Sequence, residues 1–308
     1  MSQNPLYIFL HLHKCAGNTL VIQLRENFAP EEIVSLYNFE DETLTNRDII
    51  RERLSSLSPE QRTKLKVIFG HEVYYGLHEL FPDREVRYIT FLRHPIKRTV
   101  SHYNFYRTQF ADGKMSEHFK PDIYRAGAIL TFPRWVREIE CYHNFIFRHF
   151  YSHFFNEELF DGGRDVQVEA EGLDQIKKIL DQFYFVGLTE NPADFLFIYR
   201  QLGFKKFLLN QNISRKYFKL EDHPENRSLI IDINHFDQAI YDYGVQLNQR
   251  FKENHPSFDL EVTRTRLARI FNPTYIMAHF YNYSAKLKKL FRAYVKLINR
   301  IKGIQTKA

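Results

Sequence analysis

Short runs of apolar residues alternate with longer amphipathic segments along most of this chain. The short runs are apolar on both sides and are only long enough for β-strands, as expected for strands buried on both faces of a sheet. We predict strands over Tyr7–His13, Lys66–His71, Val86–Arg93 and Phe183–Leu188.

The segments between the short runs place their apolar residues at helical spacing. Pro95 stands where the first turn of a helix accepts proline. Ala29–Thr45 is predicted as a loop and Ala111–Glu140 as irregular. Helices are predicted after Gly17 and over Asn46–Leu54, Pro59–Leu65, Pro95–Arg107, Cys141–Phe155, Leu173–Gln182, Asn191–Leu202 and His235–Phe251.

Strands that alternate with helices predict an α/β fold with a mainly parallel central sheet flanked by helices. Ligands of such sheets bind beyond the carboxyl ends of the strands. Lys14, His71 and Arg93 each stand at the predicted carboxyl end of a strand. We therefore expect these three side chains to lie near one another at one edge of the sheet.

The segment Tyr7–Leu24 combines a strand, a turn of small residues and a helix start. This geometry points free backbone N–H groups and the positive end of the helix dipole at an anion, and Lys14 adds a full charge. Asn18 or Thr19 is expected to cap the helix. The alternative is an ordinary βα turn with a solvated lysine. A Walker A loop fits poorly, because its lysine follows the glycines, whereas Lys14 precedes Gly17.

A second candidate anion site follows the strand that ends at Arg93. Arg98 and Ser101 lie on the helix predicted from Pro95. A guanidinium fork and a hydroxyl together suit a phosphate group. The alternative is a solvated Arg98 and a serine with no special role.

Together these two segments resemble the paired cofactor motifs of PAPS-dependent sulfotransferases (PAPS is 3′-phosphoadenosine 5′-phosphosulfate). The nearest branch holds the heparan sulfate 2-O- and 6-O-sulfotransferases and their bacterial relatives. There, one strand ends in H-x-P-K-[TS]-[GA]-G-[TS]-[TS], and a later strand ends in L-R-[DN]-P-x-x-R with a serine eight residues after the first arginine. The chain matches with Lys14 to Thr19, Gly70-His71 between the motifs, and Arg93-His94-Pro95, Arg98 and Ser101.

The resemblance covers roughly residues 6 to 252 and includes Phe185–Phe204 and Asp237–Phe251. Four positions of the two motifs depart from the family pattern. His13 stands in place of proline, Cys15 in place of threonine or serine, Asn18 in place of a hydroxyl residue, and His94 in place of an acidic residue or asparagine.

The resemblance implies a P-loop-kinase-like sulfotransferase fold and transfer of a sulfuryl group from PAPS to an acceptor hydroxyl. The acceptor expected from it is a carbohydrate or another cell-envelope molecule, such as a glycan or glycolipid. His71 would be the general base, Lys14 would stabilise charge on the departing phosphate, and no metal would take part. The 5′-phosphosulfate would be held by Lys14, Cys15, Ala16, Gly17, Asn18 and Thr19, and the 3′-phosphate by Arg93 and Ser101.

Weaker candidates have structural alternatives that the sequence leaves open. His78 is a second candidate base, and Cys15 beside a helix N-terminus is a candidate nucleophile. Trp135, with Arg134 and Arg137, is a candidate wall of an acceptor groove. Arg215 and Lys216 are candidate contacts to the nucleotide.

Composition indicates a folded globular protein, because the 308 residues are 44% apolar and 16% aromatic. Two cysteines give no disulfide framework, which suits a reducing compartment. With no signal peptide or membrane-spanning run apparent, we expect a cytoplasmic protein, peripheral to a membrane if attached to one.

The net charge of +6 is concentrated at the C-terminal end. From Val262 onward the chain holds 11 lysines and arginines and no acidic residue. The basic balance is therefore no sign of a nucleic-acid partner for the rest of the chain. We predict a sulfotransferase domain over 1–260 and a basic amphipathic helical tail over 261–308, with apolar residues at helical spacing in Ser284–Ile301. This tail suits an anionic membrane surface or a polyanionic acceptor, or else a helix docked on its own domain.

Two other functions are compatible with parts of this pattern. One is a small-molecule kinase, which the position of Lys14 disfavours. The other is a non-catalytic protein that binds polyanions or membranes through the tail.

Overall fold

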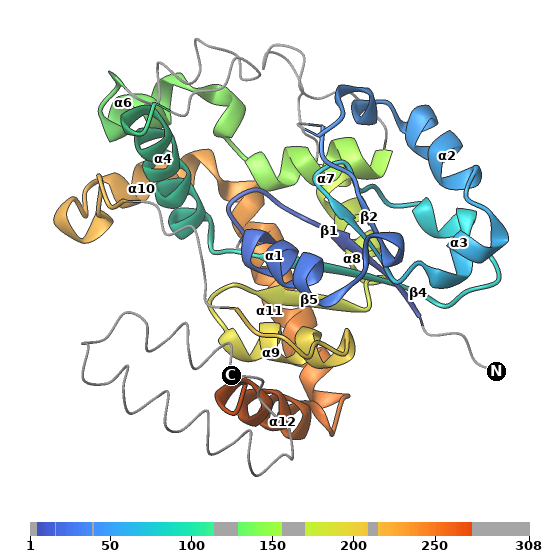
Figure 1. Ribbon diagram of the computed structural model, residues 1–308. Helices are drawn as coiled ribbons and strands as arrows, with labels where there is room; N and C mark the ends of the chain where they lie inside the picture. The colour runs from blue at the N-terminus through green and yellow to red at the C-terminus, as the bar shows by residue number, and fades with distance from the viewer. Residues whose placement is uncertain are drawn as a thin grey trace.

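The protein is described here from a computed structural model, in which residues 5–15, 17–38, 40–113, 129–155, 170–208 and 215–272 are described. Five strands form one sheet in the order β2-β3-β1-β4-β5, and every neighbouring pair is parallel (Figure 1). The predicted α/β fold with a parallel central sheet is confirmed. The strands are β1 (Leu6–Leu10), β2 (Ile33–Ser35), β3 (Val67–Gly70), β4 (Val86–Leu92) and β5 (Phe185–Leu188).

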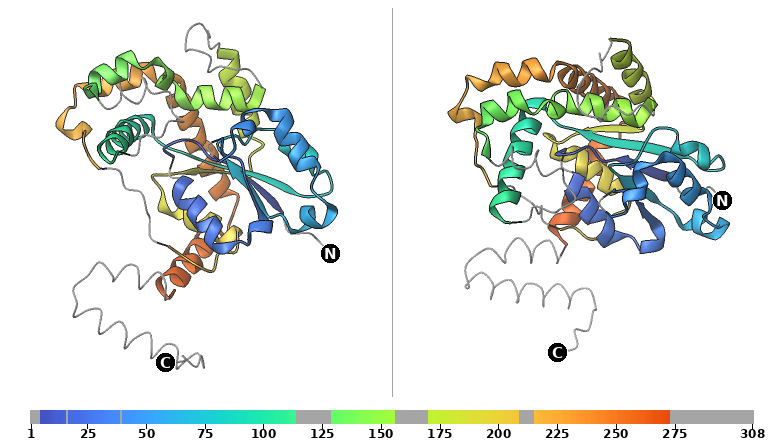
Figure 2. Two further views of the ribbon diagram at one scale, coloured as in Figure 1. Left: turned by 45° about the horizontal axis from the view of Figure 1, so that its top comes forward. Right: turned by 90° about the horizontal axis from the view of Figure 1, so that it is seen from above.

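Helices flank the sheet, and in Figures 1 and 2 α6 and α10 lie side by side at one end of it. Three of the helices, α3, α4 and α9, start with proline at their first position, as its fixed φ favours. The described helices are α1 (Gly17–Asn27), α2 (Arg47–Ser55), α3 (Pro59–Lys64), α4 (Pro95–Ala111), α6 (Phe132–Glu138), α7 (Phe145–Phe155), α8 (Ala170–Leu180), α9 (Pro192–Gln201), α10 (Asn226–Ile233), α11 (His235–Glu253) and α12 (Phe258–Ile270). Short 3₁₀ helices cover Pro30–Glu32, Glu42–Thr45, Leu77–Leu80, Glu140–Tyr142 and Leu220–Asp222.

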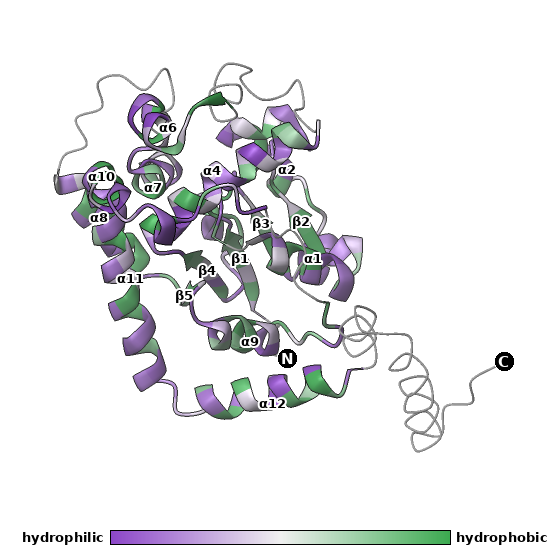
Figure 3. Cartoon of the chain, turned by 90° about the vertical axis from the view of Figure 1, so that its left-hand side faces the viewer, coloured by the Kyte–Doolittle hydropathy of each residue, from purple (hydrophilic) through white to green (hydrophobic). Residues whose placement is uncertain are grey.

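The central strand β1 is buried on both faces, which explains its uninterrupted apolar run. Because side chains alternate along a strand, Leu6, Ile8 and Leu10 join one hydrophobic cluster with residues of α7, α8 and α11. Tyr7 and Phe9 join a second cluster with residues of α1, α9 and α12. Each face of the sheet is thus covered by its own layer of helices. In Figure 3, β4 and β5 are coloured as largely hydrophobic strands.

The predicted elements differ from the observed ones mainly where segments are short. The loop predicted over Ala29–Thr45 is wrong in part, because it contains β2, a half-buried edge strand of three residues. The helix predicted over Cys141–Phe155 is interrupted at Asn144, whose φ is 46°. α6 lies in the segment predicted as irregular, and α10 was not predicted at all.

The C-terminal part of the described chain packs onto the domain. α12 spans the predicted domain boundary at residue 260 and contacts α9, with Phe258 and Val262 buried. The segment Ser284–Ile301 lies outside the described residues, so the predicted tail helix stays a prediction. Within the residues described, none of the helices has the length and apolar character needed to cross a membrane.

Candidate active site

The strand order brings the three predicted strand ends together. β1 lies between β3 and β4, with Leu10 paired to Gly70 on one side and to Thr90 on the other. The chain continues from these strand ends into Lys14, His71 and Arg93. The expectation that these residues follow adjacent strands at one edge of the sheet is confirmed.

The turn after β1 leads directly into the N-terminus of α1. Lys14 adopts a left-handed conformation, with φ of 63°, and the Cys15 N–H donates to the carbonyl of Leu12 at 3.3 Å. α1 begins at Gly17, so Asn18 and Thr19 lie in its first turn, and the prediction that one of them is the cap is wrong. Ala16, the residue before α1, lies outside the described residues. Amides of a first helical turn have no acceptor within the helix, and no acidic side chain is present in this turn.

Gly17 is required at this place because the ring of His11 occupies the space beside it. A Cβ atom on residue 17 would lie 1.8 Å from Cδ2 of His11 and 2.0 Å from its Nε2. The Gly17 backbone therefore approaches the buried imidazole of His11 as closely as a residue without a side chain allows.

Two cations of the site, Lys14 and Arg93, are held next to each other. Nη1 of Arg93 donates to the backbone carbonyl of Lys14 at 3.0 Å. Nζ of Lys14 lies 4.1 Å from the centre of the Phe105 ring. Burial, followed by repulsion from Arg93, lowers the pKa of Lys14 to about 8. Across the described ranges, no carboxylate forms an ion pair with either residue, so an anion bound here would relieve this repulsion.

His71 follows a glycine that the local backbone requires. Gly70 has φ of 153°, and a Cβ atom there would lie 1.9 Å from the carbonyl oxygen of Leu36. Nδ1 of His71 donates to the carbonyl of His11 at 2.5 Å, because a carbonyl oxygen can only accept. The lone pair of the neutral ring is therefore on Nε2. His71 as a whole residue is half-buried.

The pKa of His71 differs from that of a free imidazole. Burial lowers it to about 4, although the hydrogen bond to the His11 carbonyl opposes this change. His71 is a neutral and weak base at pH 7, with its tautomer fixed by the backbone.

Ser101 lies on α4 one helical turn before Phe105, the residue whose ring contacts Lys14. His94 caps α4 by accepting from the Ile96 N–H at Nδ1 (3.3 Å). Its own N–H donates to Glu190 at 3.2 Å. Ser101 is half-buried two turns into this helix, and no described residue is hydrogen-bonded to its hydroxyl.

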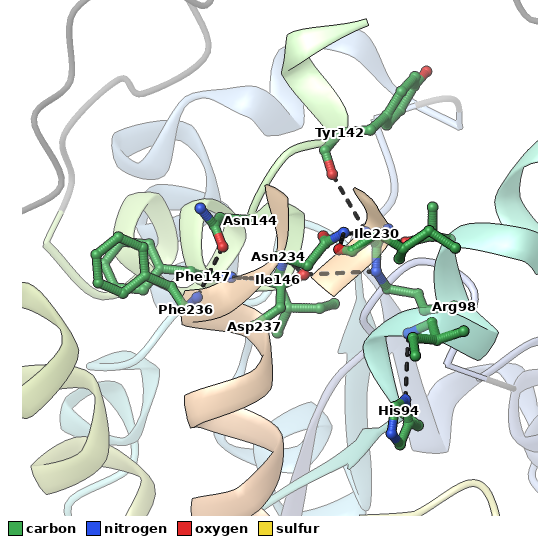
Figure 4. Close-up of polar contacts among 12 residues, drawn as sticks. His94, Arg98, Tyr142, Asn144, Ile146, Phe147, Ile230, Asn234, Phe236 and Asp237 are labelled. Carbon is green, nitrogen blue, oxygen red and sulfur yellow. Dashed lines mark hydrogen bonds and ion pairs between the residues drawn. The ribbon is translucent and has the colours of Figure 1, made fainter. Parts of the chain in front are cut away.

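Arg98 is neither a phosphate clamp nor a solvated residue. It is fully buried, and its Nε lies 3.7 Å from Asp237 of α11. Its Nη2 donates to Asn234 and to the carbonyl of Tyr142, and Figure 4 shows it reaching from α4 toward both. Asp237 in turn accepts from two backbone N–H groups of α7. Arg98 therefore joins three helices of the core.

The weaker candidates acquire structural explanations. Burial raises the pKa of Cys15 to about 12, so the idea of a reactive thiolate is wrong. His78 is held by the hydroxyl of Tyr88 through its backbone N–H and its ring. Trp135 is buried among aromatic rings of the core. Arg215 pairs with Asp112 at 2.7 Å.

Histidines that the sequence analysis did not single out surround His71. The ring centroid of His13 lies 3.6 Å from that of His71, and the centroid of His11 lies 4.4 Å from it. His149 and His153 of α7 stack on each other behind His13. The sequence signal was the pair of histidines on either side of Leu12 at the end of β1. Within the described part of the chain, no group of three or more histidine, cysteine or acidic side chains is arranged to hold a metal ion.

Comparison of the sequence with protein-family models finds no matching family, and a search of curated proteins finds no significant match.

Proposed function

We propose that this protein is a sulfotransferase that moves the sulfuryl group of PAPS to a hydroxyl of an acceptor, such as a glycan, a glycolipid or another cell-envelope molecule. The observation that carries the proposal is the pair Lys14 and Arg93. These two cations lie side by side just before α1, without a described carboxylate partner, and they follow the strands β1 and β4. His71, a base of fixed tautomer, follows β3 on the other side of β1.

In the proposed reaction, the acceptor oxygen attacks sulfur in line with the bond to the 5′-phosphate. The hydroxyl proton passes to Nε2 of His71 as the new S–O bond forms. The bond between sulfur and the phosphate oxygen breaks, and its electron pair stays on the phosphate of the product, 3′-phosphoadenosine 5′-phosphate (PAP). Lys14 and the amides of the first turn of α1, including those of Gly17, Asn18 and Thr19, stabilise that charge.

The 3′-phosphate is assigned to Arg93 and Ser101. An arginine that is already oriented by a backbone carbonyl loses little freedom when it binds an anion. The Ser101 hydroxyl is free of described partners and can donate to the same phosphate. A kinase would have no use for a 3′-phosphate site.

Calorimetric titration of the full chain with PAP, ATP and ADP tests this assignment. A sulfotransferase should bind PAP more tightly than ATP, whereas a small-molecule kinase should prefer ATP or ADP. A non-catalytic polyanion-binding protein should not distinguish among the three by the position of their phosphates. Transfer of labelled sulfate onto a panel of glycans and glycolipids then identifies the acceptor.

The role of His71 is tested by turnover. A general base contributes about 10²–10⁴-fold, so His71→Ala should lower kcat by about that factor while PAP still binds. Because the pKa of His71 is lowered to about 4, the activity should rise with pH through that region and change little through pH 6.5. His78→Ala is the matched control and should keep most of its turnover. A folded His71→Ala variant with nearly native kcat would place the base elsewhere.

We also propose that the C-terminal segment attaches the protein to an anionic membrane surface. The outer face of α12 exposes Leu260, Leu267 and Phe271, with fractional exposures of 51%, 49% and 56%, and Arg264 lies on the same face. Exposed apolar residues beside basic ones fit the interface of an anionic bilayer. The chain from Val262 onward adds further basic residues without an acidic one.

Sedimentation with vesicles tests the membrane proposal. The full chain should bind phosphatidylcholine vesicles only when they contain phosphatidylglycerol, and less at high salt. Leu267→Gln and deletion of residues 284–308 should each weaken this binding and leave PAP affinity unchanged. Self-association through α12, or a truncated chain that does not fold, would contradict the proposal.

A further inference from the structure

The imidazole of His71 is contacted on its faces by two other imidazoles. The His13 ring is nearly parallel to it, at 18° and 3.6 Å between centroids. The His11 ring lies 4.4 Å away at 33°. His13 stands where the related sulfotransferase motif has proline, and a proline has no aromatic face to offer.

The hydrogen bond from Nδ1 of His71 to the carbonyl of His11 fixes only one atom of the ring. It leaves the ring plane free to turn about that bond. Contact with a flat ring on the face removes this freedom, because a turned His71 would collide with it. The direction of Nε2 therefore depends on both the carbonyl and the stacked ring.

The stacked ring is itself held in place. Edges of His13 meet Phe145 and His149 of α7, with centroids at 5.5 and 6.0 Å. Nδ1 of His11 is hydrogen-bonded to the Tyr37 hydroxyl at 2.5 Å. The two flanking imidazoles are thus anchored to α7 and to the segment after β2.

From this geometry we infer that His13 is a positioning residue, which holds the ring plane of His71 so that Nε2 faces the acceptor hydroxyl. The inference rests on the function proposed above. When His71 accepts the acceptor proton, Nδ1 keeps its own proton and its bond to the His11 carbonyl. The neighbouring imidazoles must stay neutral during this step, because a second charge at this distance would oppose protonation.

The groups that face His71 are consistent with that requirement. Burial holds the pKa of His11, His13 and His149 well below the ordinary value of histidine. Tyr37 meets the ring edge at 4.8 Å. The Glu72 carboxylate raises the pKa of His71 and the His153 ring lowers it; Nε2 of His153 lies 3.6 Å from Glu72.

Replacement of His13 by phenylalanine and by alanine separates a positioning role from other roles. His13→Phe keeps a flat ring against His71 and cannot be protonated, whereas His13→Ala removes the ring. His235→Ala, on the exposed start of α11, is the matched control. NMR of the full chain carrying ¹³C and ¹⁵N in histidine reports the tautomer and titration of His71, whose signals are identified by their loss in His71→Gln.

In the native protein and in His13→Phe, we expect the Nδ1–H tautomer and titration well below pH 6.5. In His13→Ala, the freed and more hydrated ring should titrate about one pH unit higher. The kcat of His13→Ala should fall about ten- to hundredfold with an unchanged KM for PAPS, and that of His13→Phe should fall much less. His235→Ala should match the native protein in each measurement.

Equal His71 titration in the native protein and in His13→Ala would overturn the inference, as would equal kcat in His13→Ala and His13→Phe. If His13→Ala does not fold, His13→Leu provides the variant without a flat ring. If even the native protein shows no sulfate transfer, the proposed function fails, and the NMR comparison alone decides whether His13 positions His71.

Discussion

Arg93 and Arg98 come from one short segment at the start of α4, yet the fold uses them in opposite ways. Arg93 is half-buried and adjacent to a second cation, and among the described residues its hydrogen-bond partner is the backbone carbonyl of Lys14. Arg98 is fully buried and lies against Asp237, with Asn234 and Tyr142 as further acceptors. The two arginines differ in that Arg98, the core residue, lies against a carboxylate. Arg93, the candidate ligand-binding residue, has no carboxylate partner among the described residues.

The same contrast separates the two sides of the site. Around Arg98, Asp237 supplies negative charge and also accepts from the first amides of α7. Around Lys14 and Arg93, the first amides of α1 have no acidic side chain in their own turn. One helix N-terminus is satisfied by the protein itself, whereas no described side chain accepts from the first amides of the other, which is the site we propose for the anion.

The largest expected effect is on stability. Arg98→Met leaves the carboxylate of Asp237 buried without its cation, which should cost about 3–5 kcal/mol of unfolding free energy. Arg134→Met is the matched control, because it breaks an exposed ion pair with Glu138 and should cost far less stability than Arg98→Met. Urea unfolding followed by circular dichroism measures both. If both variants lost a similar amount of unfolding free energy, the ion pair of Arg98 with Asp237 would not be a special feature of the core.

The second effect is on cofactor affinity. Arg93→Ala should weaken PAP binding by roughly 2–4 kcal/mol, because it removes one partner of a charged pair. Binding of adenosine 5′-phosphosulfate, which lacks the 3′-phosphate, should be almost unchanged. Arg137→Ala, which removes an exposed arginine of α6, controls for the loss of net charge. A parallel loss for both nucleotides would show that Arg93 does not recognise the 3′-phosphate.

The contrast between the two arginines also marks the limit of what the sequence predicted. The strands and their carboxyl ends could be read from local apolar runs, which depend on neighbouring residues alone. The burial of Arg98 depends on its ion pair with Asp237. These two residues are far apart in the sequence and meet only in the folded protein. Such a pairing has no local signature, and neither does the three-residue edge strand β2.

The histidine stack was missed for a related reason. His11 and His13 lie next to His71 only because β1 pairs with β3, with Leu10 opposite Gly70. The sequence predicted both strands and their carboxyl ends at one edge of the sheet, but not the register that sets Leu10 opposite Gly70. The burial that lowers the pKa of His71 also comes from tertiary packing and has no local signature.

A smaller effect is expected from the Ser101 hydroxyl. A hydrogen bond to a charged group is worth about 1.5–3 kcal/mol, and Ser101→Ala should weaken PAP binding by an amount near the lower end. Affinity for adenosine 5′-phosphosulfate should again be unchanged. Ser228→Ala, at an exposed position of α10, is the control. If Ser101→Ala binds PAP as tightly as the native protein, Arg93 holds the 3′-phosphate without it.

The smallest effect concerns the proton of Lys14. Burial and Arg93 lower the pKa of Lys14 to about 8, and a bound phosphate should raise it again by adding negative charge. Between these two pKa values the complex holds a proton that the free protein has lost. Binding therefore takes up a proton, and PAP affinity should fall by up to tenfold, about 1.4 kcal/mol, for each pH unit above 8. Below pH 8 this lysine should cause no pH dependence.

Calorimetry between pH 7 and 9.5, in pairs of buffers with different ionisation enthalpies, measures both the affinity and the proton uptake. Lys14→Arg provides the matched control, since a guanidinium stays charged throughout this range and should abolish the uptake. A native affinity that is constant up to pH 9.5 would mean that Lys14 does not contact the anion. A slope that persists in Lys14→Arg would assign the titration to another group. The expected result would show that the site at the N-terminus of α1 takes up a proton when it binds an anion. The N-terminus of α7 differs from it because Asp237 already accepts from its first amides.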